Sequence, residues 1–143
     1  MGKTTNALEV VLEYFMKGNK IMALEKLAEV EQYHLEIIQD LFRKPHTGVI
    51  SINPLLHELK RYINDEFGDD YDKCYDQLVS YGELLSTSII SAYIFESGYH
   101  NHWLDMRKYL VTDSNFREAN VKMEESAVKL RSLMRSNLRQ ICI

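Results

Sequence analysis

The 143-residue sequence contains few residues that cross-link or interrupt a chain: two cysteines, two prolines and six glycines. Cys74 and Cys142 lie far apart and form no CxxC pair. Two thiols in a chain long enough to bury a core favour a reducing cytoplasm over a disulfide scaffold. Because proline and glycine are scarce, the breaks between helices are few and can be placed from the sequence.

An excess of one charge and long apolar runs are also absent from the sequence. Seventeen basic and twenty-one acidic residues leave a net charge of -4. This argues against a protein that binds nucleic acid mainly through the phosphate backbone, since such binding needs a basic surface. The first residues contain no apolar segment typical of a signal peptide. Charged residues interrupt the apolar stretches before about 18 residues, the length that would span a bilayer. We therefore expect a cytoplasmic protein without a nucleic-acid or membrane partner.

Apolar spacing and capping residues predict four helices in the first two thirds of the chain. They run over Asn6–Gly18, Lys20–Phe42, Asn53–Gly68 and Asp69–Glu96. Asn6 would cap the first helix, and the proline and glycine of Lys44–Gly48 would end the second. Pro54 would occupy the first position of the third helix, where its missing N–H costs nothing. Gly82 falls inside the fourth helix, where we expect a bend or a close backbone approach.

The last third of the chain changes in character. Aromatic and β-branched residues predict short strands over His102–Met106 and Tyr109–Thr112, followed by a turn at Asp113–Asn115. A helix is predicted over Val121–Leu138, and another strand begins at Ile141. Strands of this length need partners to form a stable sheet. The predicted fold class is mainly α with a few short strands, in one partial domain over residues 1–143.

Three short motifs contain chemically useful residues. Gly2-Lys3-Thr4-Thr5 is similar to the end of a phosphate-binding P-loop, or else is a polar lead-in to a helix. In the segment 81–87, Gly82 could admit a ligand whose amino or hydroxyl group meets Glu83, or the glycine could serve a helix crossing. His100 and His102 could share one strand face, but zinc needs further ligands, and no metal site is expected.

Four segments together resemble the aspartate kinases of the amino-acid kinase superfamily. In order along the chain they are 2–6 (GKTTN), 80–87 (SYGELLST), 103–108 (WLDMRK) and 112–119 (TDSNFREA). The resemblance implies the three-layer α/β/α fold of that superfamily. It also implies that residues 7–80 are the helical insertion of the family and that residues 81–143 are part of the α/β layer on the substrate side.

The resemblance implies an activity and a set of site residues. The family transfers the γ-phosphoryl group of ATP, with Mg²⁺, to the side-chain carboxylate of L-aspartate, the first step of lysine, threonine and methionine biosynthesis. It implies Thr5, Gly82 and Glu83 as the aspartate-binding residues, with no catalytic residue or metal ligand in this chain. The further pocket residues implied are Thr4, Asn6, Ser86, Arg107, Asp113 and Phe116.

The chain also departs from that family. The phosphate-binding loop that precedes the first segment and the nucleotide-binding loops that follow the last have no counterpart in the 143 residues. We therefore expect the isolated chain to be inactive, to bind no cofactor tightly, and to self-associate or form a homo-oligomer through apolar surface. The alternative is a standalone, non-enzymatic helical interaction module derived from the kinase. A remnant of a P-loop NTPase is a third, more distant interpretation.

Overall fold

The computed structural model describes residues 2–136 and 141–142, and it is mainly helical, with 74% helix and 3% strand. This confirms the predicted class of a mainly α chain with a few short strands. The elements are α1 (Gly2–Met16), α2 (Lys20–Leu41), α3 (Pro45–Asp65), α4 (Tyr71–Val79), α5 (Tyr81–Glu96), β1 (Asn101–His102), η1 (Met106–Lys108), α6 (Met123–Ser136) and β2 (Ile141–Cys142).

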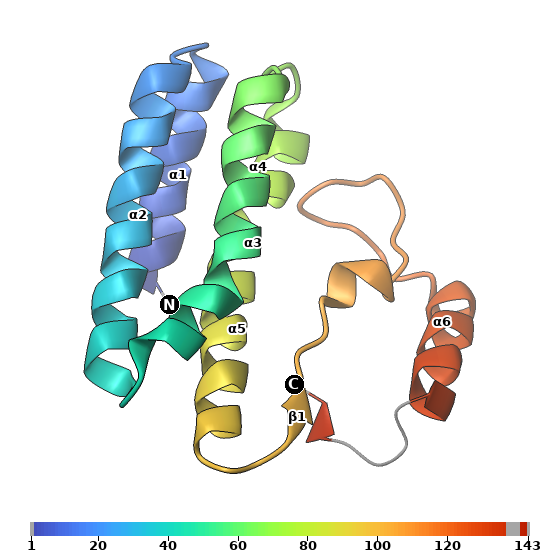
Figure 1. Ribbon diagram of the computed structural model, residues 1–143. Coiled ribbons are helices and arrows are strands. Elements are labelled where there is room, and N and C mark those ends of the chain that lie inside the picture. Colours follow the sequence, from blue (N-terminus) through green and yellow to red (C-terminus); the bar gives the residue numbers. More distant parts are fainter. Residues whose placement is uncertain (1, 137–140, 143) are drawn as a thin grey trace.

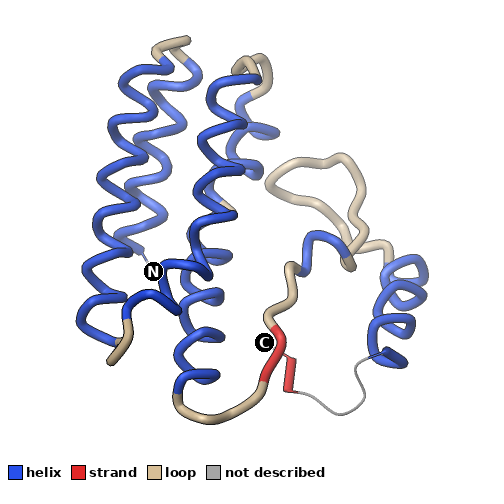
Figure 2. The backbone as a smooth tube through the Cα atoms, viewed as in Figure 1, coloured by secondary structure: helices blue, strands red, loops and turns tan. Residues whose placement is uncertain are grey.

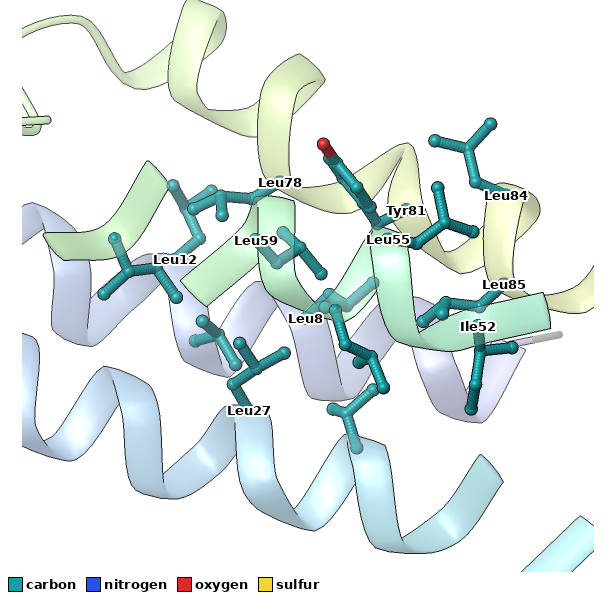
Figure 3. Close-up of a cluster of buried hydrophobic side chains, with 14 of the residues drawn as sticks. Leu8, Leu12, Leu27, Ile52, Leu55, Leu59, Leu78, Tyr81, Leu84 and Leu85 are labelled. Atoms are coloured by element: carbon teal, nitrogen blue, oxygen red, sulfur yellow. The ribbon is translucent and has the colours of Figure 1, made fainter. Parts of the chain in front are cut away.

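Helices α1 to α5 form a bundle around one apolar core (Figure 1). Helix α1 packs against α2 and α4, and α3 packs between α2 and α5. Leucines from all five helices dominate the core, and Figure 3 shows them meeting between the helices. Burying one such side chain completely contributes about 1.5–3 kcal/mol, so this cluster is the main source of stability. The fully buried leucines are Leu8, Leu12, Leu27, Leu59, Leu78 and Leu85.

The predicted single helix over Asp69–Glu96 is wrong, because the chain breaks at Ser80 into α4 and α5. Asp70 caps α4, and its carboxylate accepts a hydrogen bond from the backbone N–H of Lys73 at 3.1 Å. Gly82 consequently lies in the first turn of α5. A Cβ atom on Gly82 would lie 3.5 Å from both Thr4 Cγ2 and Leu8 Cδ1 of α1. Both atoms belong to side chains and lie at an ordinary contact distance, so the expected close approach of another backbone is not observed at this glycine.

The first helix begins earlier than its predicted cap. Helix α1 starts at Gly2, and Asn6 is an exposed residue within it. Thr4 is buried at the start of α1, where it packs beside Gly82. This tertiary contact extends the helix through residues that a capping rule places outside it. The predicted end is confirmed, since Gly18 follows the helix with a φ of 71°.

Neither proline lies where the sequence predicted it. Pro45 opens α3, and Gly48 lies inside that helix rather than in a linker. Pro54, expected at the helix start, is exposed in the interior of α3. Proline in a helix removes one backbone hydrogen bond and bends the axis. Figure 1 shows the first part of α3 crossing the bundle before the helix turns to run along it.

The region 97–142 contains less strand than the sequence predicted. In the described parts of this region, the strands are β1 at Asn101–His102 and β2 at Ile141–Cys142, which pair in parallel (Figure 2). The predicted strands over 102–106 and 109–112 are wrong beyond this point: residues 106–108 form a 3₁₀ turn, and Thr112 makes a single antiparallel bridge to Val121. The last helix spans Met123–Ser136, so the predicted end at Leu138 lies outside the described residues.

The segment Tyr71–Glu96 is long and apolar enough to cross a membrane when judged by length and composition. In the fold, 56% of the most apolar window in this segment is buried. The core helix of a water-soluble bundle has the same properties, so this observation is weak support for a membrane span.

Candidate functional site

Three of the four segments that carry the family resemblance meet at the first turns of α5. The start of α1 reaches α5 through the contact between Thr4 and Gly82. The segment 103–108 reaches it twice: the indole N–H of Trp103 donates to Thr87 Oγ1 at 3.0 Å, and the Arg107 guanidinium carbon lies 4.7 Å from the centre of the Tyr81 ring. Two distant parts of the chain therefore contact the first turns of α5, and we call this set of contacts the junction.

The aspartate-binding residues implied by the resemblance lie at this junction. Thr5 follows the buried Thr4 and is half-buried, and Glu83 follows Gly82 and is exposed in the first turn of α5. An acidic residue in a first turn interacts favourably with the helix dipole. Because the N-terminal ends of α1 and α5 touch at Thr4 and Gly82, a hydroxyl and a carboxylate are available close to two helix starts.

The hydroxyl residues that follow Glu83 bond to its backbone. Ser86 Oγ and Thr87 Oγ1 both donate to the carbonyl oxygen of Glu83, at 3.1 and 2.7 Å. Thr87 in turn accepts the hydrogen bond from Trp103. Ser86 is thus close to Glu83, as the resemblance implies, while Thr87 connects Glu83 to the segment 103–108.

A polar network joins that segment to the start of α5. The Asp105 carboxylate is buried, and both its oxygens accept hydrogen bonds from the Arg107 guanidinium, at 2.9 Å from Nε and 2.8 Å from Nη2. One of these oxygens also accepts the backbone N–H of Arg107 at 3.1 Å. The Tyr81 hydroxyl donates to Glu58 Oε2 at 3.0 Å, and Arg107 Nη2 lies 3.6 Å from the same oxygen.

The network shifts the ionisation of its members. The hydrogen bonds from Arg107 hold the pKa of Asp105 below its ordinary value, so the carboxylate stays charged although it is buried. Burial raises the pKa of the Tyr81 phenol, partly offset by the nearby guanidinium. Burying a carboxylate is unfavourable unless it is paired and hydrogen-bonded, which Arg107 achieves with bidentate geometry.

Sequence reasoning placed Arg107 in the pocket but missed its partners Glu58, Tyr81 and Asp105. Asp105 and Arg107 are separated by one residue, the spacing at which an aspartate can cap a turn and also bind the side chain that follows. This spacing could have indicated the pair. Glu58 is 23 residues from Tyr81 along the chain, and no local signal in the sequence connects them.

Asp113 and Phe116 lie in a loop that contacts α4 through Arg117. Asp113 orders this loop by accepting hydrogen bonds from the backbone of Asn115 and from the backbone and side chain of Asn120. The Asn120 amide holds the pKa of Asp113 below its ordinary value. Phe116 is half-buried. The predicted turn at Asp113 is confirmed by the bond from Asn115.

Arg117 anchors that loop to the bundle. Its backbone N–H donates to Asp76 Oδ2 at 2.8 Å, and its guanidinium lies 3.5 Å from Asp72 and 4.5 Å from the centre of the Tyr75 ring. These residues belong to α4, one helix before the junction. The described contacts therefore do not bring Asp113 and Phe116 together with Thr5 and Glu83.

The described residues offer little for a metal or a nucleotide. Among residues 2–136, no group of three or more histidine, cysteine or acidic side chains is placed to hold a metal ion. A hollow of about 210 Å³ lies beside the junction, and its acidic lining suits a cation better than a triphosphate. The residues that line it are Glu58, Arg61, Tyr62, Asp65, Glu66, Gln77 and Tyr81.

Compared with protein-family models and with curated protein sequences, the chain matches none.

Proposed function

We propose that the chain is the helical insertion and part of the substrate-side α/β layer of an aspartate kinase, which phosphorylates the side-chain carboxylate of L-aspartate. The observation that carries the proposal is the junction at the start of α5. Segments 2–6 and 103–108, which were grouped with 80–87 by their resemblance to one family, each contact segment 80–87 in the fold.

The residues at the junction suit the recognition of an amino acid. The exposed Glu83 carboxylate can pair with the α-ammonium group of aspartate, and the Thr5 hydroxyl can donate a hydrogen bond to a substrate carboxylate. Gly82 has no side chain to obstruct the approach of a ligand. Asn6 is exposed one residue beyond Thr5, so an amide is also available at this end of α1.

Among the described residues, no group of three or more acidic, histidine or cysteine side chains is placed to hold Mg²⁺. The γ-phosphoryl transfer would need phosphate-binding residues outside this chain, because such transfer depends on cationic groups and metal ions around the phosphates. The contribution of this chain is to bind and orient L-aspartate. We accordingly expect the isolated 143 residues to show no turnover.

The test is an ATP-dependent assay that traps aspartyl phosphate with hydroxylamine, performed on the complete protein that contains this chain. The variant Glu83→Gln keeps the shape of the side chain but removes its charge. We expect it to raise the KM for L-aspartate roughly 10- to 100-fold, since a hydrogen bond to a charged group contributes about 1.5–3 kcal/mol. Glu13→Gln, at an exposed position on α1, is the matched control and should leave the KM unchanged.

No aspartyl phosphate from a folded complete protein that binds ATP would contradict the proposal. A normal KM for L-aspartate in Glu83→Gln would keep the reaction but remove Glu83 from its proposed role.

The second candidate is a standalone helical interaction module. One observation favours it: among the described residues, the buried residues of the hydrophobic core all lie in α1 to α5 or in the connection between α2 and α3. A bundle of this kind can bury its apolar stripes without a sheet. This candidate predicts that the complete protein binds neither ATP nor L-aspartate while its bundle remains folded, which isothermal titration with each ligand would decide.

A further inference from the structure

The segment 103–107 contacts α5 on both sides of Glu83 in the sequence. Trp103 bonds to Thr87, which lies one helical turn after Glu83 and donates to its carbonyl oxygen. Arg107 stacks on Tyr81, two residues before Glu83. The backbone of the glutamate is therefore tethered at two points by one short segment from another part of the chain.

We propose that the Asp105–Arg107 pair is a positioning device that fixes the first turn of α5, and with it the Glu83 carboxylate, for binding the ammonium group of L-aspartate. This inference rests on the proposed function. It gives a role to Arg107 that differs from direct contact with substrate.

The geometry at Arg107 favours positioning over substrate binding. Both oxygens of the buried Asp105 carboxylate occupy the Nε and Nη2 donors of the guanidinium. One face of the guanidinium lies over the Tyr81 ring, and Glu58 lies 3.6 Å from Nη2. A guanidinium that is already paired and stacked is held in one orientation, and it transmits that orientation to the residue on which it stacks.

The position of Tyr81, which Arg107 restrains, fixes the first turn of α5 that contains Glu83. Tyr81 is the first residue of α5 and is 93% buried, with a relative exposure of 7%. Figure 3 shows its ring beside the core leucines, with the hydroxyl oxygen pointing away from them, and this hydroxyl donates to Glu58. Ser80, at the N-cap of α5, makes no side-chain capping bond. The first turn of α5 thus depends on Tyr81 and its partners for its position, more than on a local cap.

The experiment measures the KM for L-aspartate, the KM for ATP and kcat in the complete protein for the variant Arg107→Met. This change keeps an unbranched side chain of similar length but removes the pair with Asp105. We expect the KM for L-aspartate to rise about tenfold, because small displacements of a binding group weaken catalysis and binding steeply. The KM for ATP should stay within about twofold. Lys108→Met, which removes a neighbouring exposed positive charge, is the control and should change none of the three constants.

A spectroscopic readout reports on the same junction. Trp103 is the only tryptophan in the 143 residues, and its indole bonds to Thr87. In the isolated chain, Arg107→Met should shift the Trp103 emission toward that of a solvent-exposed indole, and Lys108→Met should not. Arg107→Lys retains the charge over Tyr81 but loses the bidentate pair, so it should give an intermediate KM for L-aspartate. It also serves where the methionine variant does not fold.

The outcomes separate this inference from the proposed function. If Glu83→Gln raises the KM for L-aspartate while folded Arg107→Met and Arg107→Lys leave it unchanged, the positioning role is wrong and the proposed function stands. If neither Glu83→Gln nor the Arg107 variants alter that KM, the aspartate site itself is misplaced. An equal rise in the KM for L-aspartate and for ATP in Arg107→Met would also overturn the positioning role, since it would indicate general loss of structure.

Discussion

The bundle of residues 2–96 and the region 97–142 are held together by different forces. Among the described residues, every buried apolar residue of the core precedes residue 90, and Trp103 is the partly buried residue of the later region that packs against that core. Within the described part of the later region, the buried residues are Asp105 and Ser126, both polar. Hydrophobic burial stabilises the first region, whereas hydrogen bonds and charge pairs order the second.

Helix α6 illustrates the contrast. Its side chains Ala127, Leu130 and Met134 line an apolar hollow with Arg131 and Arg135, and Met134 is 55% exposed. The bundle helices instead direct their apolar stripes at one another. A sequence pattern can therefore predict that α6 is amphipathic while leaving open what its apolar face contacts.

The largest expected difference between the two regions concerns the loss of one apolar side chain. Leu59→Ala removes a completely buried group, and we expect it to lower the free energy of unfolding by about 3 kcal/mol. Met134→Ala on α6 should lower it by no more than about 0.5 kcal/mol. Urea unfolding followed by circular dichroism measures both. Equal losses would show that α6 is packed as tightly as the bundle.

Alanine substitutions at Gly48 and Gly82 should have different effects on the free energy of unfolding. A Cβ atom at Gly48 would lie 2.7 Å from Ile38 Cγ2, so Gly48→Ala should cost about 1–3 kcal/mol of unfolding free energy. At Gly82 the nearest atoms would be 3.5 Å away, an ordinary contact. Gly82→Ala should therefore keep stability or increase it by up to about 1 kcal/mol.

The variant Gly82→Ala distinguishes two roles of that glycine, access for a ligand and the crossing of α1 and α5. If Gly82 admits L-aspartate, the complete protein carrying Gly82→Ala remains stable but shows a higher KM for L-aspartate. Thermal unfolding and the hydroxylamine assay on the same sample measure the two effects. A large loss of stability in Gly82→Ala would instead assign the glycine to the crossing of α1 and α5.

Acid should affect the two regions at different pH values. His34 is buried in α2 with Nδ1 2.7 Å from the carbonyl oxygen of Val30, and burial lowers its pKa below the ordinary 6.5. The unfolded chain takes up a proton at this histidine as the pH falls through 6.5, while the folded chain does not. Bundle stability from His34 is therefore present above pH 6.5 and is lost as the pH falls through the lower folded pKa.

Asp105 gives the later region its own acid response. Because Arg107 holds the pKa of Asp105 below 3.8, its stabilising contribution is present above pH 3.8 and is lost as the pH falls further. Urea midpoints measured against pH should decline below pH 6.5 in the parent and less in His34→Leu, with the exposed His57→Leu as the control. The fluorescence emission of Trp103, which lies in the same segment as Asp105, should change only below about pH 4. A single shared transition would contradict separate control of the two regions.

The sequence predicted those features that depend on local patterns. The apolar stripe of α1, the glycine after α1 and the turn at Asp113 are all confirmed, because each depends on residues within one or two turns. At Gly82 the sequence predicted a bend or a close backbone approach, whereas the structure shows a break at Ser80 and ordinary contacts with side chains of α1.

The features that escaped prediction depend on contacts between distant residues. Tertiary packing of Thr4 extends α1 past the expected cap at Asn6, and α3 continues through Pro54. The expected strand after His102 is replaced by a turn that the Asp105 carboxylate stabilises. At the candidate site, Glu83 and Thr5 were named from a resemblance, whereas the links through Glu58 and Tyr81 depend on the arrangement of α3 against α5.

The parallel pairing of Asn101–His102 with Ile141–Cys142 has a consequence for the order of folding. This pairing closes a loop of about 40 residues for only two residues of strand on each side, so its entropic cost precedes a small gain. Helix pairs that are adjacent in sequence, such as α1 with α2, close short loops and assemble quickly. We therefore expect the strand pair to form late in folding and to open locally while the helical bundle stays folded.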